Sequence, residues 1–405
     1  MIHFYTPPLY NFMKEEIKAP AKLKHNAEDF IVEEIGEKWN CKISEDPKFN
    51  SNPDLEKLDL ENPRDFLCCE MEKKNIDHFQ AIKDVASKLN KGVDAIGYAG
   101  TKDKKAWTCQ RISIFKPDID KIKNFKHPNI ILKNFKWSKR KIKMGYLEAN
   151  HFTITLRDID KKDAMKITNQ IKKKNWFPNY FGAQRFGSMR GNNVKIGELI
   201  IKRKFESAVM AILTDTNENE RPDIKYAREK LKKTNDFNAA SKYFPNYLKL
   251  EKQILFYLSR NKDDFLGAIK KAERKNMLMF LHSVQSKMFN EILERALDEG
   301  MDFTKEGQQS CLLMGYKTRF FNGHLGDIEK QVLSEHNLEL SDFDIREIPY
   351  LRIKGSFRKA ITEVKSIETS IDNDEEFENS KKITLSFTLP SGVYATTFLE
   401  NHFTI

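Results

Sequence analysis

Apolar residues recur along this chain at two different spacings, and each spacing predicts a different kind of element. Residues 27–34 are expected to form a turn that enters a strand, with Phe30 and Val32 on one face, and in 152–156 alternate residues would face the core of a half-buried strand. A further strand is expected at 65–71. Residues 77–89 instead place their apolar side chains on one helical stripe, which predicts an amphipathic helix. The first part of the chain is therefore expected to combine strands with helices.

The middle of the chain has a different pattern from its ends. A polar break at 217–222 opens a helix-rich stretch that continues to Gly300, and a last strand is expected at 383–389. Strand-rich ends around a helix-rich middle predict an α+β fold, in which an α-rich insertion interrupts a domain and the C-terminal strand returns to the N-terminal sheet.

The bulk properties fit a soluble protein with more than one domain. The chain has 405 residues, of which 40% are hydrophobic and 32% are charged. No apolar run approaches the roughly 20 residues that span a bilayer, and the first residues lack the features of a secretory signal. We therefore expect a cytoplasmic protein without a membrane association.

The net charge of +11 favours a polyanionic partner. A basic composition can also arise without such a partner, because Lys, Asn, Ile and Phe rise together under biased codon composition, and lysine-rich surfaces occur in thermophiles. The charge therefore supports a nucleic-acid partner without establishing one.

The five cysteines do not form a metal-binding pattern in the sequence. Cys41, Cys68, Cys69, Cys109 and Cys311 contain no CxxC pair and have no histidine cluster at ligand spacing. No glycine-rich cofactor loop follows a predicted strand either. We expect reduced thiols, no metal and no cofactor.

A single aspartate, Asp103, stands out in the segment 97–110. It lies between Lys102 and Lys104, and apolar segments on both sides predict that it sits on a loop between two strands. A solvated hairpin tip would look similar, although the bulky Trp107 is unusual there. A carboxylate among cations can act on a nucleobase as a nucleophile or base.

The segment 179–187, Asn-Tyr-Phe-Gly-Ala-Gln-Arg-Phe-Gly, fits neither a helix nor a strand well. Its rings could stack on a planar base while Gln184 and Arg185 donate hydrogen bonds. The alternative is a loop held by buried rings. A third feature, the basic run 136–143 with Lys139 and Arg140, either contacts RNA phosphates or is a solvated face.

These segments resemble, in order, the motifs of the TruD family of tRNA pseudouridine synthases, with an archaeal-type member as the best description. The nine residues 179–187 match the family motif without exception, and the matching positions run from Lys24 to Thr397. The motifs concerned are Lys24 with Glu28-Asp29-Phe30, Gly100 to Lys104 with Thr108 and Gln110, 179–187, 283–292, and 389–396. Ala27 departs from the proline that is frequent in bacterial members.

The resemblance implies roles for individual residues. Asp103 would be the catalytic aspartate, Lys24 its ion-pair partner, Phe181 the ring that stacks on the uracil, and Asn179 a positioning amide. Phe30, Gln184 and Arg185 belong to the same motifs and are expected to bind substrate, together with the basic pair Lys139 and Arg140.

The resemblance also implies a fold and an activity. A pseudouridine-synthase-like catalytic domain would comprise 1–205 and 362–405, with a family-specific insertion at 206–361. The expected reaction isomerises uridine, with position 13 of tRNA as the usual target, and needs neither a metal nor a protein partner. A non-catalytic RNA-binding or chaperone protein on the same scaffold is the alternative. Its main difficulty is Asp103, because binding an anionic ligand requires no isolated carboxylate.

Overall fold

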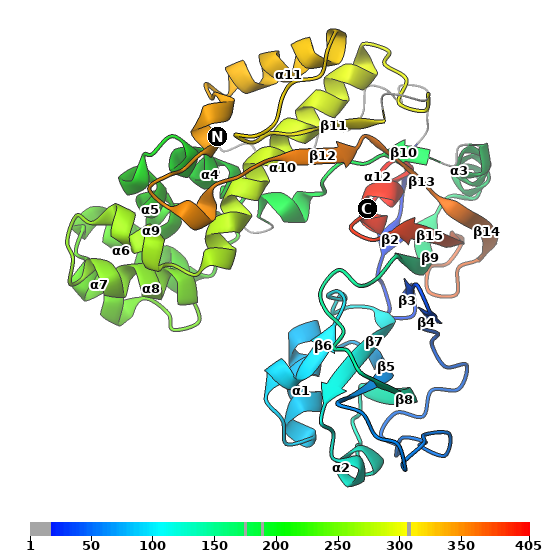
Figure 1. Ribbon diagram of the computed structural model, residues 1–405. Helices are drawn as coiled ribbons and strands as arrows, with labels where there is room; N and C mark the ends of the chain where they lie inside the picture. Colours follow the sequence, from blue (N-terminus) through cyan, green and yellow to red (C-terminus); the bar gives the residue numbers. More distant parts are fainter. Residues whose placement is uncertain (1–17, 174–175, 188–189, 306–308) are drawn as a thin grey trace. The chain divides into compact units, whose positions relative to one another are not determined.

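The computed structural model describes residues 18–173, 176–187, 190–305 and 309–405. Contacts divide the chain into two compact units (Figure 1). Glu15–Phe177 and Thr362–Ile405 form one, called here the sheet unit, and Pro178–Ile361 lies in the other, the helical unit. Within the described ranges, no helix has both the length and the apolar character needed to cross a membrane. The insertion at 206–361 stays a prediction, and the compact helical unit already includes the residues from Pro178 onward.

A ten-stranded sheet forms the sheet unit, and its strands follow the order β14-β15-β9-β3-β7-β5-β8, with β2, β4 and β6 pairing beside this path. The strands are β2 (Lys22–Leu23), β3 (Phe30–Gly36), β4 (Trp39–Asn40), β5 (Phe66–Lys74), β6 (Ile96–Tyr98), β7 (Trp107–Phe115), β8 (Ile130–Ser138), β9 (Ala149–Ile159), β14 (Lys365–Asn373) and β15 (Lys381–Pro390). A separate parallel pair joins β1 (Ala19–Pro20) to β16 (Phe403–Thr404).

The sheet confirms the predicted α+β class and the predicted return of the C-terminal strand. β15 pairs antiparallel with β9, so residues near the end of the chain complete a sheet that the N-terminal half begins. Along the main order, β3 and β7 are parallel, whereas the other neighbours are antiparallel. The turn predicted to enter a strand within 27–34 is confirmed, and the strand β3 begins at Phe30.

Helices cover the sheet at two places and create two apolar cores. Near β5, β7 and β8 lie α1 (His78–Lys88) and α2 (Ile119–Lys123), and the 3-10 turn η1 (Val93–Ala95) precedes β6. Asp77 caps α1 by accepting hydrogen bonds from two backbone amides of its first turn. Against β9 and β15 lie α3 (Lys161–Lys173) and α12 (Ala395–Glu400). Each fully buried aliphatic side chain in these cores contributes about 1.5–3 kcal/mol.

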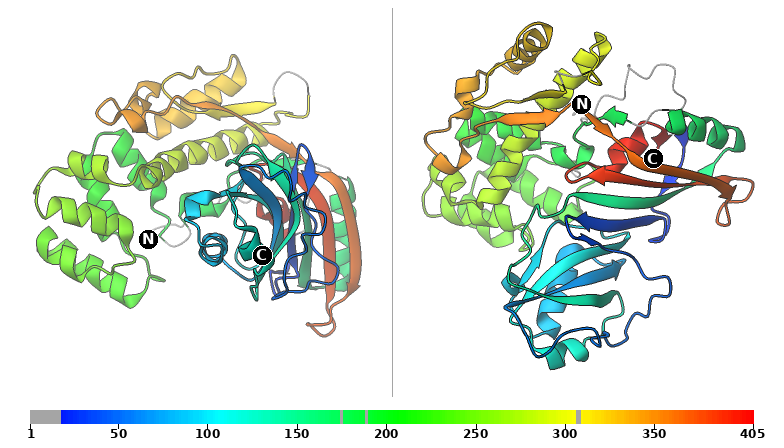
Figure 2. Two further views of the ribbon diagram at one scale, coloured as in Figure 1. Left: turned by 60° about the horizontal axis from the view of Figure 1, so that its bottom comes forward. Right: turned by 45° about the vertical axis from the view of Figure 1, so that its right-hand side comes forward.

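The long helix α10 (Arg274–Asp298) organises the helical unit (Figure 2). It packs against α4, α11 and β11, and its buried residues lie on several sides, which is why it carries no single apolar stripe. The remaining elements are α4 (Asn193–Ile201), α5 (Phe205–Thr214), α6 (Pro222–Thr234), α7 (Phe237–Tyr243), α8 (Lys249–Leu258), α9 (Phe265–Lys271), α11 (His324–Glu335), β11 (Ser310–Leu313), β12 (Ser356–Lys359), η2 (Ala183–Phe186), η3 (Leu340–Phe343) and η4 (Pro349–Leu351). Two short strands, β10 (Trp176–Pro178) and β13 (Ile361–Glu363), lie where the chain passes between units.

The helical pattern at 194–212 forms two helices rather than one. α4 ends at Ile201 and α5 begins at Phe205, because Arg203 between them has a left-handed backbone with φ of 57°. Its guanidinium donates to the carbonyl oxygens of Asp342 and Asp344, which holds this corner in place.

His336 joins three helices of the helical unit. It follows α11 directly, and its ring nitrogens lie 2.7 Å from Glu198 of α4 and 2.7 Å from Glu291 of α10. Burial alone would lower the pKa of His336, but the hydrogen bonds and charges of the two carboxylates outweigh it and raise the pKa to about 9.

We predict that this link makes the stability of the helical unit depend on pH. Because the pKa of His336 is raised from 6.5 to about 9 on folding, its contribution is complete below the lower value and is lost as pH rises to the upper one. A difference of one pKa unit corresponds to about 1.4 kcal/mol, so the loss of stability is at most about 3.5 kcal/mol. Melting curves measured on both sides of this window should show the loss.

The variant His336→Gln should melt with little pH dependence across the same window. His324→Gln is the matched control, since His324 pairs with Glu299 on the exposed surface of the same unit. Equal pH dependence of the His336 variant and the unsubstituted chain would contradict the prediction.

Candidate active site

Asp103 lies on the loop that joins β6 to β7, as predicted. The loop has no regular secondary structure, and Ala99 and Ala106 are buried at its two ends. The Asp103 side chain is 45% exposed, so its carboxylate reaches solvent, whereas the two ends of the loop are buried. This arrangement presents one carboxylate at the surface of an otherwise packed sheet.

Lys24 forms an ion pair with Asp103. The Lys24 Nζ lies 2.8 Å from Oδ2 of Asp103, and the same ammonium is 4.0 Å from the ring centroid of Phe30. The backbone of Lys24 has a left-handed φ of 56°, which is uncommon for a residue with a long side chain. Its surroundings must therefore hold it in this conformation.

A buried ion pair holds the turn that carries Lys24. Asp29 accepts hydrogen bonds from the backbone N–H of Asn26 and from Nε of Arg157, and it is 2% exposed. The hydrogen bonds from Arg157 to Asp29, and further ones to Asp374, raise the pKa of the guanidinium above its ordinary value. This pair links the turn to β9 and thereby fixes the position from which Lys24 reaches Asp103.

Buried polar groups support the Asp103 loop from within the sheet unit. The Lys73 ammonium, on β5, donates to the carbonyl oxygen of Asp103 at 2.6 Å and to that of Ile76 at 2.9 Å. The Lys102 ammonium pairs with Glu34 of β3 at 2.7 Å, and both side chains are buried. Gln110 of β7 donates to the Gly100 carbonyl at 3.1 Å. The segment from Gly100 to Asp103 is therefore fixed to three different strands.

Two titratable groups below the loop have lowered pKa values. Burial lowers the pKa of Lys73 to about 8, although the charges of Asp103 and Asp77 act in the opposite direction. Burial and the charges of Lys73 and Lys102 lower the pKa of His78 to about 4, so its ring is neutral near pH 7. The positive charge at the base of the loop therefore comes from the lysines.

The sequence did not single out Lys73 and Glu34. Both are next to other charged residues in their strands, and charged residues normally lie on the solvent-facing side of a strand. Here the sheet is covered on both faces, and Lys73 and Glu34 are fully buried. Their burial depends on neighbouring strands, so the local pattern contained no signal for it.

Phe181 lies in the helical unit and is tightly held there. Asn290 of α10 bonds both the N–H and the carbonyl of Phe181, each at 2.9 Å. The ring is 4% exposed and meets Phe289 edge to face. The guanidinium carbon of Arg358 lies 4.1 Å from the ring centroid, and that of Arg185 lies 5.1 Å from it.

Asn179 uses its amide groups within the same unit. Its side-chain nitrogen donates to the Lys359 carbonyl at 2.9 Å, and its side-chain oxygen accepts from Arg358 at 2.6 Å. The backbone N–H donates to the Ala360 carbonyl. Gln184 is exposed on η2. The motif is therefore joined to β12 through Asn179 and to α10 through Phe181.

The expected site residues thus form two groups. Lys24, Phe30 and Asp103 meet in the sheet unit, whereas Asn179, Phe181 and Arg185 meet in the helical unit. Phe30 is 2% exposed, so in this structure its visible role is to support the Lys24 ammonium. The roles of both groups toward a substrate stay predictions.

Lys139 and Arg140 are exposed in the loop that follows β8, not on the strand itself, because β8 ends at Ser138. Beside them is a hollow of about 250 Å³ that combines cationic with aromatic side chains. Its lining includes Lys38, Trp39, Arg111, Lys136, Trp137, Arg140, Lys141 and Tyr146. Such a combination suits an anionic ligand with planar groups.

Comparisons with known proteins agree with the family motifs. The family described as tRNA pseudouridine synthase D (TruD) matches residues 10–312 and 304–402. The "probable tRNA pseudouridine synthase D" of Methanosarcina barkeri is 30% identical over 94% of this chain and 92% of its own length. The protein of the same description from Methanococcus vannielii is 34% identical over 92% of this chain and 93% of its own length. The crystal structure of the Methanosarcina mazei TruD protein superposes with a TM-score of 0.75 at 28% identity, covering 96% of this chain and 94% of that one.

We predict that Lys73 restrains the Asp103 loop. Lys73→Met removes a charged hydrogen-bond donor from two carbonyl oxygens, and such bonds contribute about 1.5–3 kcal/mol. The backbone amides of 100–104 should therefore exchange with solvent deuterium about tenfold faster or more. Hydrogen-exchange mass spectrometry of the purified protein measures this directly.

Lys136→Met is the control, because Lys136 is an exposed lysine on β8. Its effect on exchange in the Asp103 loop should be negligible. If exchange in 100–104 is the same in Lys73→Met and the unsubstituted chain, Lys73 does not restrain the loop.

Proposed function

This chain belongs to the TruD family of tRNA pseudouridine synthases, and from that premise we propose that it isomerises uridine 13 of tRNA to pseudouridine with Asp103 as the catalytic carboxylate. The observation that carries the proposal is the Lys24–Asp103 ion pair, at 2.8 Å, on a loop whose main chain is fixed by buried charges. A surface turn without a function would not need this support. We expect this reaction to take place in the cytoplasm, where tRNA is used.

The proposed reaction exchanges one bond of the nucleotide for another. The bond between ribose C1′ and N1 of uracil breaks, the base turns, and C5 bonds to C1′. C5 then loses its proton and N1 gains one, so the product is an isomer of the substrate. An ionised carboxylate serves this sequence whether it first attacks the ribose or the base.

Lys24 keeps that carboxylate ionised when the substrate arrives. Asp103 is 45% exposed in the free protein, so water solvates it. A bound nucleotide displaces this water, and desolvation favours the protonated form of a carboxylic acid. The adjacent ammonium opposes that change, and Phe30 holds the ammonium in place through a cation–π contact.

We assign Phe181 as the ring that stacks on the target uracil. Two planar guanidinium groups, from Arg185 and Arg358, lie close to this ring in the free protein. A planar base can take the place of one of them, and stacking tolerates rotation of the base in its own plane. Asn179 positions the motif, and Gln184 and Arg185 donate hydrogen bonds to the nucleotide.

Binding of the surrounding tRNA is assigned in part to the basic surface after β8. Lys139 and Arg140 are exposed there, beside the hollow with its tryptophan and tyrosine rings. The insertion at 206–361 would supply further contacts. Extrusion of a stacked uridine costs a few kcal/mol, which these contacts must offset.

The first test of this proposal is the reaction itself. The purified protein should convert uridine 13 of a tRNA transcript into pseudouridine. The variant Asp103→Asn should lose this activity, because it lacks the catalytic carboxylate. Its affinity for the transcript should stay within a few-fold of that of the unsubstituted chain, because the side-chain volume is kept and a charge that repels phosphate is removed. Mapping pseudouridine by base-specific chemical modification detects the product and its position. A product at another position would refute the assignment to uridine 13.

Pseudouridine formation by Asp103→Asn would remove Asp103 from the catalytic role. Tight binding by the unsubstituted chain without any product would instead favour the non-catalytic RNA-binding alternative.

The second test concerns the basic surface. Replacing Lys139, Arg140, Lys141 and Lys143 with glutamine should weaken tRNA binding and flatten the slope of log affinity against log salt by about 0.7–0.9 per lost phosphate contact. The rate at saturating enzyme should stay the same, because phosphate contacts of this kind act on binding and not on the reacting atoms. Filter binding over a salt series and single-turnover kinetics separate the two effects.

Neutralising four exposed lysines of α3, Lys161, Lys162, Lys166 and Lys172, changes the net charge equally in the same unit. An identical salt slope for the two quadruple variants would mean that the run after β8 is only a solvated surface.

A further inference from the structure

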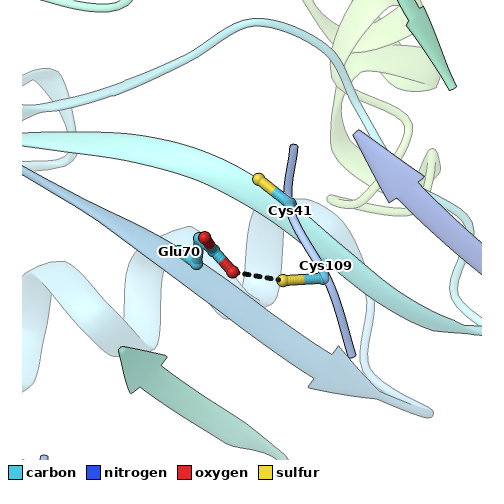
Figure 3. A group of neighbouring side chains, drawn as sticks. All are labelled: Cys41, Glu70 and Cys109. Atoms are coloured by element: carbon cyan, nitrogen blue, oxygen red, sulfur yellow. Dashed lines mark hydrogen bonds between the residues drawn. The ribbon is translucent and has the colours of Figure 1, made fainter. Parts of the chain in front are cut away.

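Two cysteines and a glutamate meet inside the sheet unit, away from the Lys24–Asp103 pair. The ligand atoms of Cys41, Glu70 and Cys109 all lie within 4.8 Å of one another (Figure 3). Cys41 is 1% exposed, Glu70 5% and Cys109 fully buried. No metal site was expected from the sequence, because the cysteines form no CxxC pair and have no histidine cluster at ligand spacing.

The register of the sheet explains how the three side chains meet. Cys109 of β7 is opposite Glu72 of β5, and Glu70, two residues before Glu72, points to the same face. Cys41 follows β4, and its backbone N–H donates to the carbonyl of Glu34 on β3, the strand next to β7. The segment after β4 therefore passes over the face that carries Cys109 and Glu70.

Glu70 differs from the other buried glutamates on this face in its hydrogen bonds. Glu72 accepts from Trp107, from both donors of Ser44 and from the Lys133 ammonium. Glu33 accepts from the backbone N–H of Ile43 at 2.8 Å and pairs with Lys42. Glu70 accepts one long hydrogen bond of 3.4 Å from the backbone N–H of Lys42 and one from the Cys109 thiol, also at 3.4 Å, which is an ordinary length for sulfur.

No ion pair to Glu70 is found in the described part of the chain. A buried carboxylate normally pairs with a cation or coordinates a metal, because an isolated buried charge is very costly. Cations of the sheet lie near, since Arg111 of β7 and Lys133 of β8 are its cross-strand neighbours. The carboxylate is nevertheless directed toward the Cys109 sulfur, and the Cys41 sulfur lies within 4.8 Å (Figure 3).

The separation of Cys109 and Glu70 fits a tetrahedral ion with sulfur and oxygen ligands. Zinc lies about 2.3 Å from thiolate sulfur and about 2.0 Å from carboxylate oxygen, which gives a sulfur–oxygen edge of about 3.5 Å in a tetrahedron. The observed separation of Cys109 Sγ and Glu70 Oε2 is 3.4 Å. These two ligands are therefore already at the spacing that such an ion requires, and the ligand atom of Cys41 lies within 4.8 Å of both.

We propose that Cys41, Cys109 and Glu70 bind a structural zinc ion, with a water molecule as the fourth ligand. Each thiol releases its proton to solvent as its sulfur binds the ion. Two thiolates and one carboxylate give the ion a local charge of minus one, which Arg111 and Lys133 balance. The thiolate pair selects zinc over magnesium and calcium, which prefer oxygen ligands.

The role of this ion is to stabilise the fold around β7, the strand that follows the Asp103 loop. It joins the segment after β4 to β5 and to β7, and β7 begins directly after the Asp103 loop. Because a thiol loses its proton when its sulfur coordinates the ion, metal binding is expected to release protons and to strengthen with pH.

The test uses the full-length protein, prepared under reducing conditions and loaded with zinc chloride or cobalt chloride. We expect one zinc per chain by elemental analysis after dialysis. The cobalt form should show the intense near-ultraviolet absorption of thiolate-to-cobalt charge transfer, and zinc should displace it. Removing the metal with a chelator should lower the melting temperature by several degrees, and adding zinc should restore it.

Ligand variants locate the site. Cys41→Ala and Cys109→Ala should each lose the cobalt absorption and the effect of the chelator on melting. Glu70→Gln keeps the shape of the side chain and should bind zinc at least tenfold more weakly. Cys69→Ala is the matched control, because Cys69 is a buried thiol on the same strand as Glu70 whose side chain packs in the core with α1.

Several results would overturn the proposal. If the unsubstituted chain takes up neither zinc nor cobalt, the proposal is wrong, and this result does not depend on whether the cysteine variants fold. Metal retained equally by Cys41→Ala would place the ion elsewhere. The protein as isolated could also have a mass lower by two hydrogen atoms and yield a cross-linked peptide that joins Cys41 to Cys109. This result would identify a disulfide in place of a metal site.

Discussion

The position of the Asp103 loop depends on charges that are buried beneath it. A surface loop without regular structure cannot hold a carboxylate in one place by itself. Lys73 binds the carbonyl of Asp103, and Lys102 binds Glu34, so the loop is attached to β5 and β3 through charged groups that water cannot reach. Because leaving such groups without partners is costly, the hydrogen bonds act as a strong constraint on the loop.

The strand β7 connects this constraint to the rest of the sheet unit. One of its faces packs with α1 and provides Gln110, which bonds the loop at Gly100. Its other face provides Cys109, which meets Glu70 and Cys41. Both faces of a central strand are therefore used for positioning, and the sheet serves as a rigid base for the Lys24–Asp103 pair. A metal ion at the cysteine cluster would add a second attachment for the same strand.

The aromatic motif is held by a different principle in the helical unit. Asn290 satisfies both backbone groups of Phe181, and Asn179 satisfies groups of the strand beside it. Here side-chain amides do most of this work, together with the Arg358 guanidinium, whose Nε donates to the carbonyl of Asn179 at 3.1 Å. Arg358 and Arg185 also approach the ring of Phe181, so cationic, planar groups lie beside it.

The sequence by itself determined the α+β class, the strands β3, β5, β9 and β15, the loop placement of Asp103, and the family to which its motifs belong. These features follow from local spacing and from contiguous residues, so they can be read along the chain. Only the tertiary structure decided that Lys73 and Glu34 are buried and that Cys41, Glu70 and Cys109 meet. In the sequence, alternating charges on β5 indicate a solvent-facing side; in the fold, the segment after β4 covers that side. The burial of a charge depends on strand register and on residues distant in the chain, and neither is present in any local pattern.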